Sequence, residues 1–239
     1  MRSALKFVMA LIVTILLMLA FRALVFTVYT VSGSGLEPCF INGDRVLVNR
    51  WSYGLRTGGG PYFRYTRWMS SPVERGDLVA FNCPSDSSVP FTSLPVSACY
   101  CTGVPGDTVT ADGVRLIVPG RGHIVKVNDS NVRLLCYLYN RYEGHSARVV
   151  DGRLIVDGAE TRCASFVNDY YWFSSGRPSE PYDSRYFGFV PESHIIGRVA
   201  VLLYSVDPSL PFYECLRPGR NRQVIRKPDA HYAEQCRRQ

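Results

Sequence analysis

The chain has 239 residues, of which 46% are hydrophobic, 13% aromatic and 20% charged. These proportions are typical of a globular protein with a hydrophobic core, and they exclude an intrinsically disordered chain. The formal net charge is +7, yet only three of the basic residues are lysines, namely Lys6, Lys126 and Lys227. Because arginine stays protonated and cannot act as a general base, a catalytic lysine has few candidates in this chain.

The N-terminal segment is a largely apolar run that begins at Leu5, is interrupted by Arg22 and continues to Val28. A helix of this length can cross the ~30 Å hydrocarbon layer of a bilayer. Arg2 and Lys6 favour a cytoplasmic N-terminus and a periplasmic or extracytoplasmic C-terminal domain. A cleaved signal peptide is the alternative, but the run is long and no small-x-small cleavage site follows at the right distance. We therefore expect a single-pass anchor in the cell (inner) membrane.

A serine- and glycine-rich turn follows this run, with the sequence Ser32-Gly33-Ser34-Gly35-Leu36-Glu37-Pro38. A membrane-tethered serine hydrolase would place its nucleophile in such a turn, close to the membrane surface. Beyond it, short apolar runs read as strands, at 45–49, 78–81, 98–102, 169–173 and 195–204. Asp-Gly pairs at 112–113 and 151–152 are hairpin signals, and one stretch, 131–142, reads as a helix. The pattern predicts a mainly β fold.

Two aromatic segments have two interpretations each. The loop from Trp51 to Trp68 and the run from Tyr170 to Phe173 are either parts of the core or apolar surface that contacts a bilayer. The C-terminal stretch is rich in arginine, which suits anionic lipid or nucleic acid but is more often a solvated end. We expect a solvated basic tail and no nucleic-acid partner.

The eight cysteines show no Cys-x-x-Cys spacing, and no paired histidines accompany them. This pattern argues against a metal site, so we expect no metal and no cofactor. Disulfides can form outside the cytoplasm, but their pairing cannot be read from the sequence.

A series of motifs then resembles, in content and order, type I signal peptidase (signal peptidase I, peptidase family S26). This family comprises membrane-anchored endopeptidases with a serine nucleophile and a lysine base, which remove signal peptides from exported proteins. After the serine- and glycine-rich turn, the matching motifs are Gly43-Asp44-Arg45-Val46-Leu47-Val48, Tyr53-Gly54, Arg75-Gly76-Asp77-Leu78-Val79-Ala80-Phe81, Gly103-Val104-Pro105-Gly106-Asp107, Asp183-Ser184-Arg185-Tyr186-Phe187-Gly188-Phe189-Val190-Pro191-Glu192 and His194-Ile195-Ile196-Gly197.

The resemblance implies a signal-peptidase-I-like β-rich catalytic core with an inserted second β-region, preceded by one N-terminal transmembrane helix. The implied divisions are a short cytoplasmic N-terminus at 1–4, the anchor at 5–28, the first part of the core at 29–107, the inserted region at 108–166, the last part of the core at 167–207 and the basic tail at 208–239.

The catalytic positions implied by the resemblance are degenerate. The family nucleophile stands three residues before the proline that aligns with Pro38, and that position is Gly35 here. Glycine has no side chain with which to attack a carbonyl. If the alignment slips by one residue, Ser34 becomes the nucleophile and Ser32 the hydroxyl that supports the oxyanion hole.

The position of the lysine base in the family falls on Cys99, four residues before Gly103. The family lysine is neutral because a dry site lowers its pKa, and a cysteine cannot replace it as an amine base. Cys99 could instead be a nucleophile, but none of the four histidines belongs to a recognisable Cys-His signature. Cys99 and Cys101 lie on the same face of a predicted strand, so we expect buried structural cysteines.

The last motif has lost its catalytic half as well. The family aspartate of the Gly-Asp-Asn segment falls on Gly176, and the family's supporting serine falls on Pro181. The residues with structural roles in the family are retained, namely Pro38, Gly43, Asp44, Gly76, Asp77, Gly103, Pro105, Gly106, Asp107, Asp183 and Arg185. Undirected decay would damage both halves alike, so the pattern indicates relaxed catalysis on a fold that is still in use.

These observations leave three hypotheses. The first is a membrane-anchored pseudo-peptidase of the export pathway, which contacts membrane lipid and binds signal peptides, exported preproteins or an active signal peptidase paralogue. Binding by strand addition needs no catalytic side chain. The second is an active signal peptidase with Ser34 as nucleophile and an unidentified base. The third is a purely structural envelope protein.

Overall fold

The computed structural model describes residues 2–31, 40–58, 65–84, 94, 96–111, 113–175, 183–207, 209–211, 214–220 and 223–225. For residues 2–5, 20–24 and 224 it describes the backbone alone.

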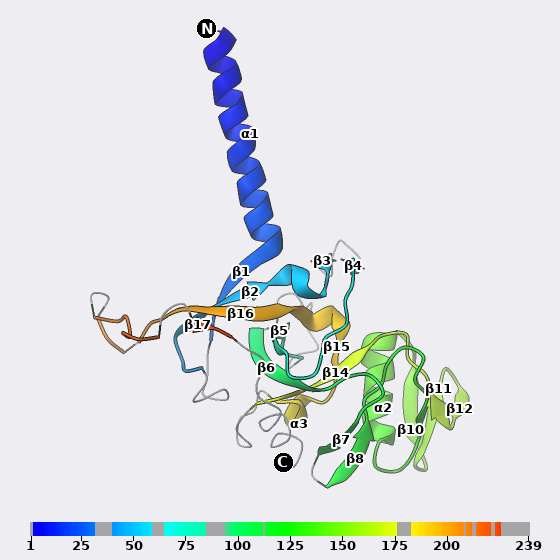
Figure 1. Ribbon diagram of the computed structural model, residues 1–239. Coiled ribbons are helices and arrows are strands. Elements are labelled where there is room, and N and C mark those ends of the chain that lie inside the picture. Colours follow the sequence, from blue (N-terminus) through cyan, green and yellow to red (C-terminus); the bar gives the residue numbers. More distant parts are fainter. Residues whose placement is uncertain are drawn as a thin grey trace.

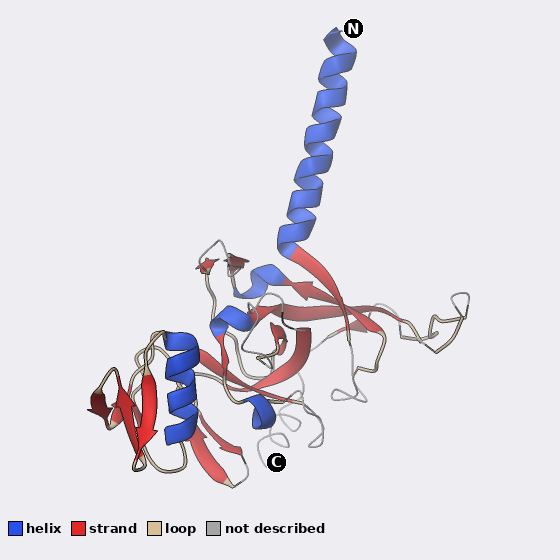
Figure 2. Cartoon of the chain, turned by 180° about the vertical axis from the view of Figure 1, so that it is seen from behind, coloured by secondary structure: helices blue, strands red, loops and turns tan. Residues whose placement is uncertain are grey.

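The fold is β-rich and is built around one antiparallel sheet (Figure 1). In spatial order its strands are β1 (Phe26–Thr30), β2 (Asp44–Asn49), β16 (Ile195–Ser205), β5 (Leu78–Asn82), β6 (Val96–Gly103), β14 (Tyr170–Ser174) and β15 (Val190–Pro191), and β17 (Gln223–Val224) pairs with β16. Figure 2 shows that the sheet is strongly curved.

Strand β5 shows why this sheet is stable. All five of its residues are buried, because alternate side chains enter two different hydrophobic clusters. Leu78 and Ala80 belong to a cluster with Val46, Val48, Tyr100 and Leu202, which we call the first core cluster. Val79 and Phe81 belong to a second core cluster on the opposite face, in which the rings of Phe81 and Phe173 stack with centroids 4.5 Å apart.

Residues 108–166 form smaller sheets and a helix with a third core cluster. The elements are β7 (Thr108–Ala111), β8 (Val114–Ile117), β9 (Val125–Lys126), α2 (Val132–Leu138), a π-helical turn η3 (Tyr139–Glu143), β10 (Ala147–Val150), β11 (Arg153–Val156), β12 (Ala159–Thr161) and β13 (Cys163–Ala164). The hairpin predicted at Asp151-Gly152 is confirmed: both residues have positive φ, and the turn joins β10 to β11.

The N-terminal helix α1 runs over Arg2–Val25, so the predicted anchor at 5–28 extends too far. The alternating β-branched and aromatic residues of Phe26–Thr30 pair with β2 instead and begin the sheet. Within the part of the chain that the structure describes, no helix combines the length and the apolar character that crossing a membrane requires. The transmembrane helix predicted at 5–28 is not found among the residues that the structure describes.

The two aromatic segments differ in burial. Tyr170, Tyr171, Trp172 and Phe173 are all buried and belong to the core. In the earlier loop, Tyr53 is buried, but Trp51 and Trp68 are 46% and 65% exposed. The exposed tryptophans lie on η1 (Arg50–Tyr53) and on the small hairpin of β3 (Leu55–Thr57) and β4 (Thr66–Trp68).

We expected a solvated basic tail, but the described beginning of the tail is bound to the globular part. Arg217 donates to the Asn42 carbonyl and forms an ion pair with Asp207 at 3.0 Å. Arg220 pairs at 2.7 Å with Asp44, whose side chain is fully buried. A buried carboxylate needs a counter-charge, and the tail supplies it.

Candidate functional site

Several predicted catalytic positions lie outside the described residues. They are the nucleophile turn, with Ser32, Ser34, Gly35 and Pro38, and the two altered positions Gly176 and Pro181. The assignments at these positions stay predictions. The base position, the motif aspartates and the last motif from Asp183 onwards are described.

Cys99, the position predicted for the base, is a thiol in a hydrophobic core. Its side chain is 2% exposed, and it belongs to the second core cluster together with Phe81 and Phe173. Burial raises the pKa of the Cys99 thiol well above its usual value, and the negative charge of Asp183 raises it further. A neutral, buried thiol can neither accept a proton from a serine hydroxyl nor act as a thiolate nucleophile.

The alternation along β6 explains why Cys99 is buried. Cys101 lies in the same cluster, and burial raises its pKa too, whereas Tyr100 between them belongs to the first core cluster on the opposite face. The prediction that the two cysteines pack on one face of a strand is confirmed. Six cysteines among the described residues, including these two, form no disulfide.

None of the lysines that the structure describes lies on the main sheet. Lys6 is on α1, and Lys126 is on β9, where it pairs with Cys163 of β13. The assignment of Lys126 to an inserted region stays a prediction. No described lysine takes the place that the family lysine would have on β6.

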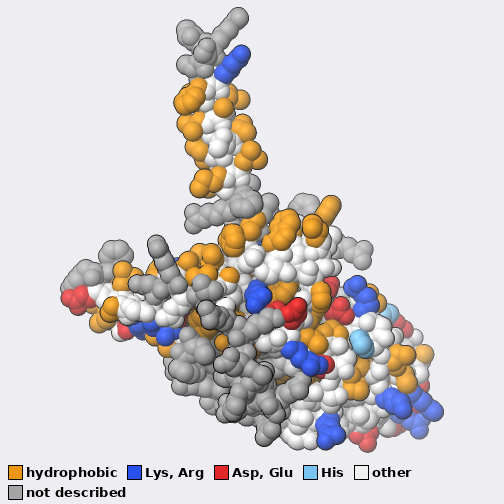
Figure 3. Space-filling model, viewed as in Figure 1, with side chains coloured by type: hydrophobic (Ala, Val, Ile, Leu, Met, Phe, Trp, Pro, Cys, Tyr) orange, Lys and Arg blue, Asp and Glu red, His pale blue; other side chains and the backbone are white. Residues whose placement is uncertain are grey.

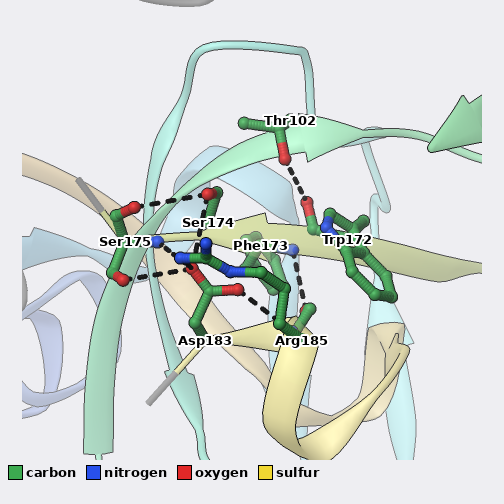
Figure 4. A network of polar contacts seen from close by, with 8 residues as sticks. Thr102, Trp172, Phe173, Ser174, Ser175, Asp183 and Arg185 are labelled. Carbon is green, nitrogen blue, oxygen red and sulfur yellow. Dashed lines mark hydrogen bonds and ion pairs between the residues drawn. The ribbon is translucent and has the colours of Figure 1, made fainter. Parts of the chain in front are cut away.

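The last motif builds a buried polar network, shown in Figure 4. Asp183, which is fully buried, caps the short helix α3 (Ser184–Phe187) by accepting from the Arg185 backbone amide, and it accepts from the Arg185 guanidinium at 2.9 Å. Its carboxylate also accepts from the Ser175 amide and hydroxyl at 2.6 and 3.0 Å and from the Ser174 hydroxyl at 3.3 Å. The network ties the end of β14 to α3.

Two other motifs are joined to each other. Arg75 binds Asp107 through two nitrogens, one of which is Nε at 2.6 Å, and Asp107 also accepts from the Val104 amide across its own turn. Gly106 in this turn has φ +87°, and a Cβ at Gly103 would lie only 2.7 Å from Val109. Glycine is therefore favoured at 106 by the backbone conformation and at 103 by the close packing of Val109.

The other two motif aspartates, Asp44 and Asp77, also make hydrogen bonds that stabilise the fold. Asp44 follows Gly43, which has φ +92°, and it accepts from the Ile41 amide at 3.0 Å. Asp77 accepts from the Tyr53 hydroxyl at 2.9 Å and is almost fully buried. Such contacts stabilise turns between strands and bring no catalytic group to a common point.

A cavity of about 800 Å³ lies beside Arg185, between α3, α2 and the β7–β8 hairpin. Most of its lining is apolar and includes Leu116, Tyr137 and Trp172. None of its described lining residues is a lysine or a histidine. Its described lining therefore offers mainly apolar surface.

Part of one edge of β6 is not paired by any other strand that the structure describes. Residues Val96 to Cys99 pair with β5 on one side, while β14 pairs with β6 only from Tyr100 onwards. No other described strand pairs with that edge of Val96 to Cys99. Backbone groups on an open edge can bind an extended chain as an added strand. Among the described residues of the site, we find no proton-transfer pair.

Sequence reasoning missed several partners in this arrangement. Ser174 and Ser175 were not assigned a role, although they are adjacent hydroxyl residues just before the last motif. The partnership of Arg75 with Asp107 was missed because the two residues belong to separate motifs. Only their shared membership of retained motifs could have suggested a contact.

Comparison with known proteins gives a consistent result. The family described as signal peptidase, peptidase S26, matches residues 4–204 of the chain. Signal peptidase I of Aquifex aeolicus (strain VF5) is 26% identical over 257 residues, covering 92% of each chain. Signal peptidase I of Pseudomonas fluorescens is 27% identical over 214 residues, covering 81% of this chain and 70% of the relative. Signal peptidase I of Bacillus caldolyticus is 24% identical over 188 residues, covering 74% and 79%.

Proposed function

We propose that this chain, which belongs to the peptidase S26 family of signal peptidases, is a non-cleaving member that binds extended segments of exported proteins. One observation carries the proposal. Cys99, the position predicted for the family's lysine base, is a neutral thiol buried against Phe81 and Phe173 in the core. Serine needs a base within hydrogen-bond reach, and a buried neutral thiol is not one.

The retained contacts support a function that depends on the fold. The Asp183–Arg185 pair and the Arg75–Asp107 pair keep both motifs in place without any catalytic group. An enzyme that had lost its activity and its use would have no reason to keep a buried ion pair, which is costly to maintain with only one partner. The retained pairs support a role that depends on the fold rather than on catalysis.

The edge of β6 at Val96 to Cys99, which no other described strand covers, is the proposed binding surface. A chain added there makes main-chain hydrogen bonds that are independent of its sequence, and shallow apolar contacts select its side chains. The partially exposed side chains of Val96 and Ala98 border the first core cluster and provide such contacts. Signal peptides, exported preproteins or an active signal peptidase with an extended segment are the proposed ligands.

The proposal places the protein at the surface of the cell membrane, with its β-rich part outside the cytoplasm, where exported chains emerge. Figure 3 shows hydrophobic side chains along α1 and on the adjoining face of the globular part. Trp51, Trp68 and Met69 are exposed, and η1, which carries Trp51, contacts α1. Tryptophan prefers the interface between lipid headgroups and water, so this face suits contact with a bilayer.

Hydrogen–deuterium exchange tests the proposal. A synthetic signal peptide with alanine at positions −3 and −1 of its cleavage site is added to the full-length protein in detergent. We expect slower amide exchange in the segment containing Val96 to Cys99, because an added strand would bind that edge. Strand β12 (Ala159–Thr161) is the matched control, since it is also an edge strand but belongs to the inserted region. Equal protection of both edges, or none at β6, would contradict the proposal.

A further inference from the structure

One edge of β16 is shared by two strands. At the beginning of β16, Ile195 to Arg198 pair with β5, and further along, Val201 and Leu202 pair with Val224 and Gln223 of β17. Figure 1 shows β17 alongside β16. The C-terminal segment is therefore an added strand on the part of the β16 edge that β5 does not cover.

The added strand also contributes an apolar side chain. The Ile225 amide donates to the Ala200 carbonyl at 3.0 Å, and the Ile225 side chain packs against the first core cluster. The other partly buried side chains on this cluster include Val31, Val96 and Ala98. Ile225 therefore packs on the same cluster that borders the proposed binding edge of β6.

The residues before β17 are held more firmly than β17 itself. Arg217 and Arg220 hold the preceding residues through ion pairs with Asp207 and Asp44. The strand itself has only two ladder positions, and Gln223 is exposed. A two-residue strand is weakly held, so it can open locally while the ion pairs keep it close to its site. The segment also lies outside residues 4–204, over which the family matches.

We infer that the β16 edge at Ala200 to Leu202 is a docking surface for an extended segment carrying a β-branched aliphatic residue, and that residues 223–225 are its built-in occupant. This inference rests on the proposed function, which is the binding of extended chains. In the inference, residues 223–225 compete with such chains for the β16 edge beside the first core cluster. A tethered segment acts at an effective concentration on the order of millimolar. An external chain therefore binds this part of the β16 edge only when it displaces β17 or when β17 is held elsewhere.

The test uses the full-length protein and a fluorescent peptide with the sequence of residues 219–230. In the Ile225→Pro variant the amide donor to Ala200 is removed, so the edge of β16 becomes available. We expect this variant to bind the peptide about tenfold or more tightly than the unaltered protein does, because the tethered competitor is lost. Ile225→Val keeps the amide and the β-branched shape, and it should bind the peptide as the unaltered protein does.

Hydrogen exchange then locates the binding. Exchange at residues 200–202 should be faster in Ile225→Pro and should slow again when the peptide is added. A second variant, Ile225→Asp, keeps the amide but places a charge on the apolar cluster, and it should also release the edge. Equal peptide affinity of all variants, or unchanged exchange at 200–202, would overturn the inference. Failure of the signal peptide to protect β6, with these results intact, would instead count against the proposed function alone.

Discussion

Cys99→Lys is expected to lower the free energy of unfolding by about 5 kcal/mol at pH 7, compared with Cys99→Ala. The reason is that the side chain at this position is buried in an apolar cluster, where a lysine pKa falls from ~10.4 to about 6. The nearby Asp183 carboxylate gives little compensation, because it is already paired with Arg185. The measurement is urea denaturation of both variants.

The pH dependence separates this effect from a loss of packing. The folded-state pKa of the introduced lysine lies below its unfolded value, so the cost is largest at or below the folded pKa. It decreases by about 1.4 kcal/mol for each pH unit between the folded pKa and ~10.4. Cys163→Lys, at an exposed position on β13, should cause no such loss. A deficit at Cys99 that did not change between pH 7 and pH 10 would show that the site is not dry.

Asp183→Ala is expected to destabilise the protein by about 3–5 kcal/mol, which corresponds to a fall in Tm of about 10 °C. The fully buried carboxylate accepts from Ser174, Ser175 and Arg185, and its removal leaves the largely buried guanidinium of Arg185 without that counter-charge. Differential scanning calorimetry measures the change. Because the network joins β14 to α3, the effect should appear in the global transition.

Glu160→Ala is the matched control for this variant. Glu160 also pairs with arginines, at 3.2 Å with Arg153 and 3.4 Å with Arg162, but these pairs are exposed. Exposed pairs contribute less than about 1 kcal/mol, so Tm should hardly change. Similar losses in the two variants would mean that burial of the Asp183 network is not what stabilises it.

Much of the site could be predicted because its determinants are local. The alternation of Cys99, Tyr100 and Cys101 fixes which side chains enter which core cluster. The turn at Gly103 to Asp107 was predicted from its glycines and proline, and Gly106 has the positive φ that such a turn requires. The β-rich fold followed from the strand patterns and from the order of the motifs.

Other features depend on contacts between distant residues, which a pattern along the chain does not encode. Arg220 and Asp44 are 176 positions apart, so a basic tail was read as a solvated end. The switch from helix to strand at Phe26 depends on pairing with β2, whereas the apolar run alone favoured a longer helix. Tertiary pairing overrode the local signal in both places.

The central claim is that this chain binds but does not cleave, and a preprotein cleavage assay tests it most directly. The full-length protein in detergent or liposomes is incubated with a labelled preprotein, beside an active signal peptidase I and beside the Ser34→Ala and Cys99→Ala variants. We expect no product above the buffer background from the chain or from either variant. Cleavage at the signal-peptide junction that is lost in Ser34→Ala would contradict the claim and establish Ser34 as a nucleophile.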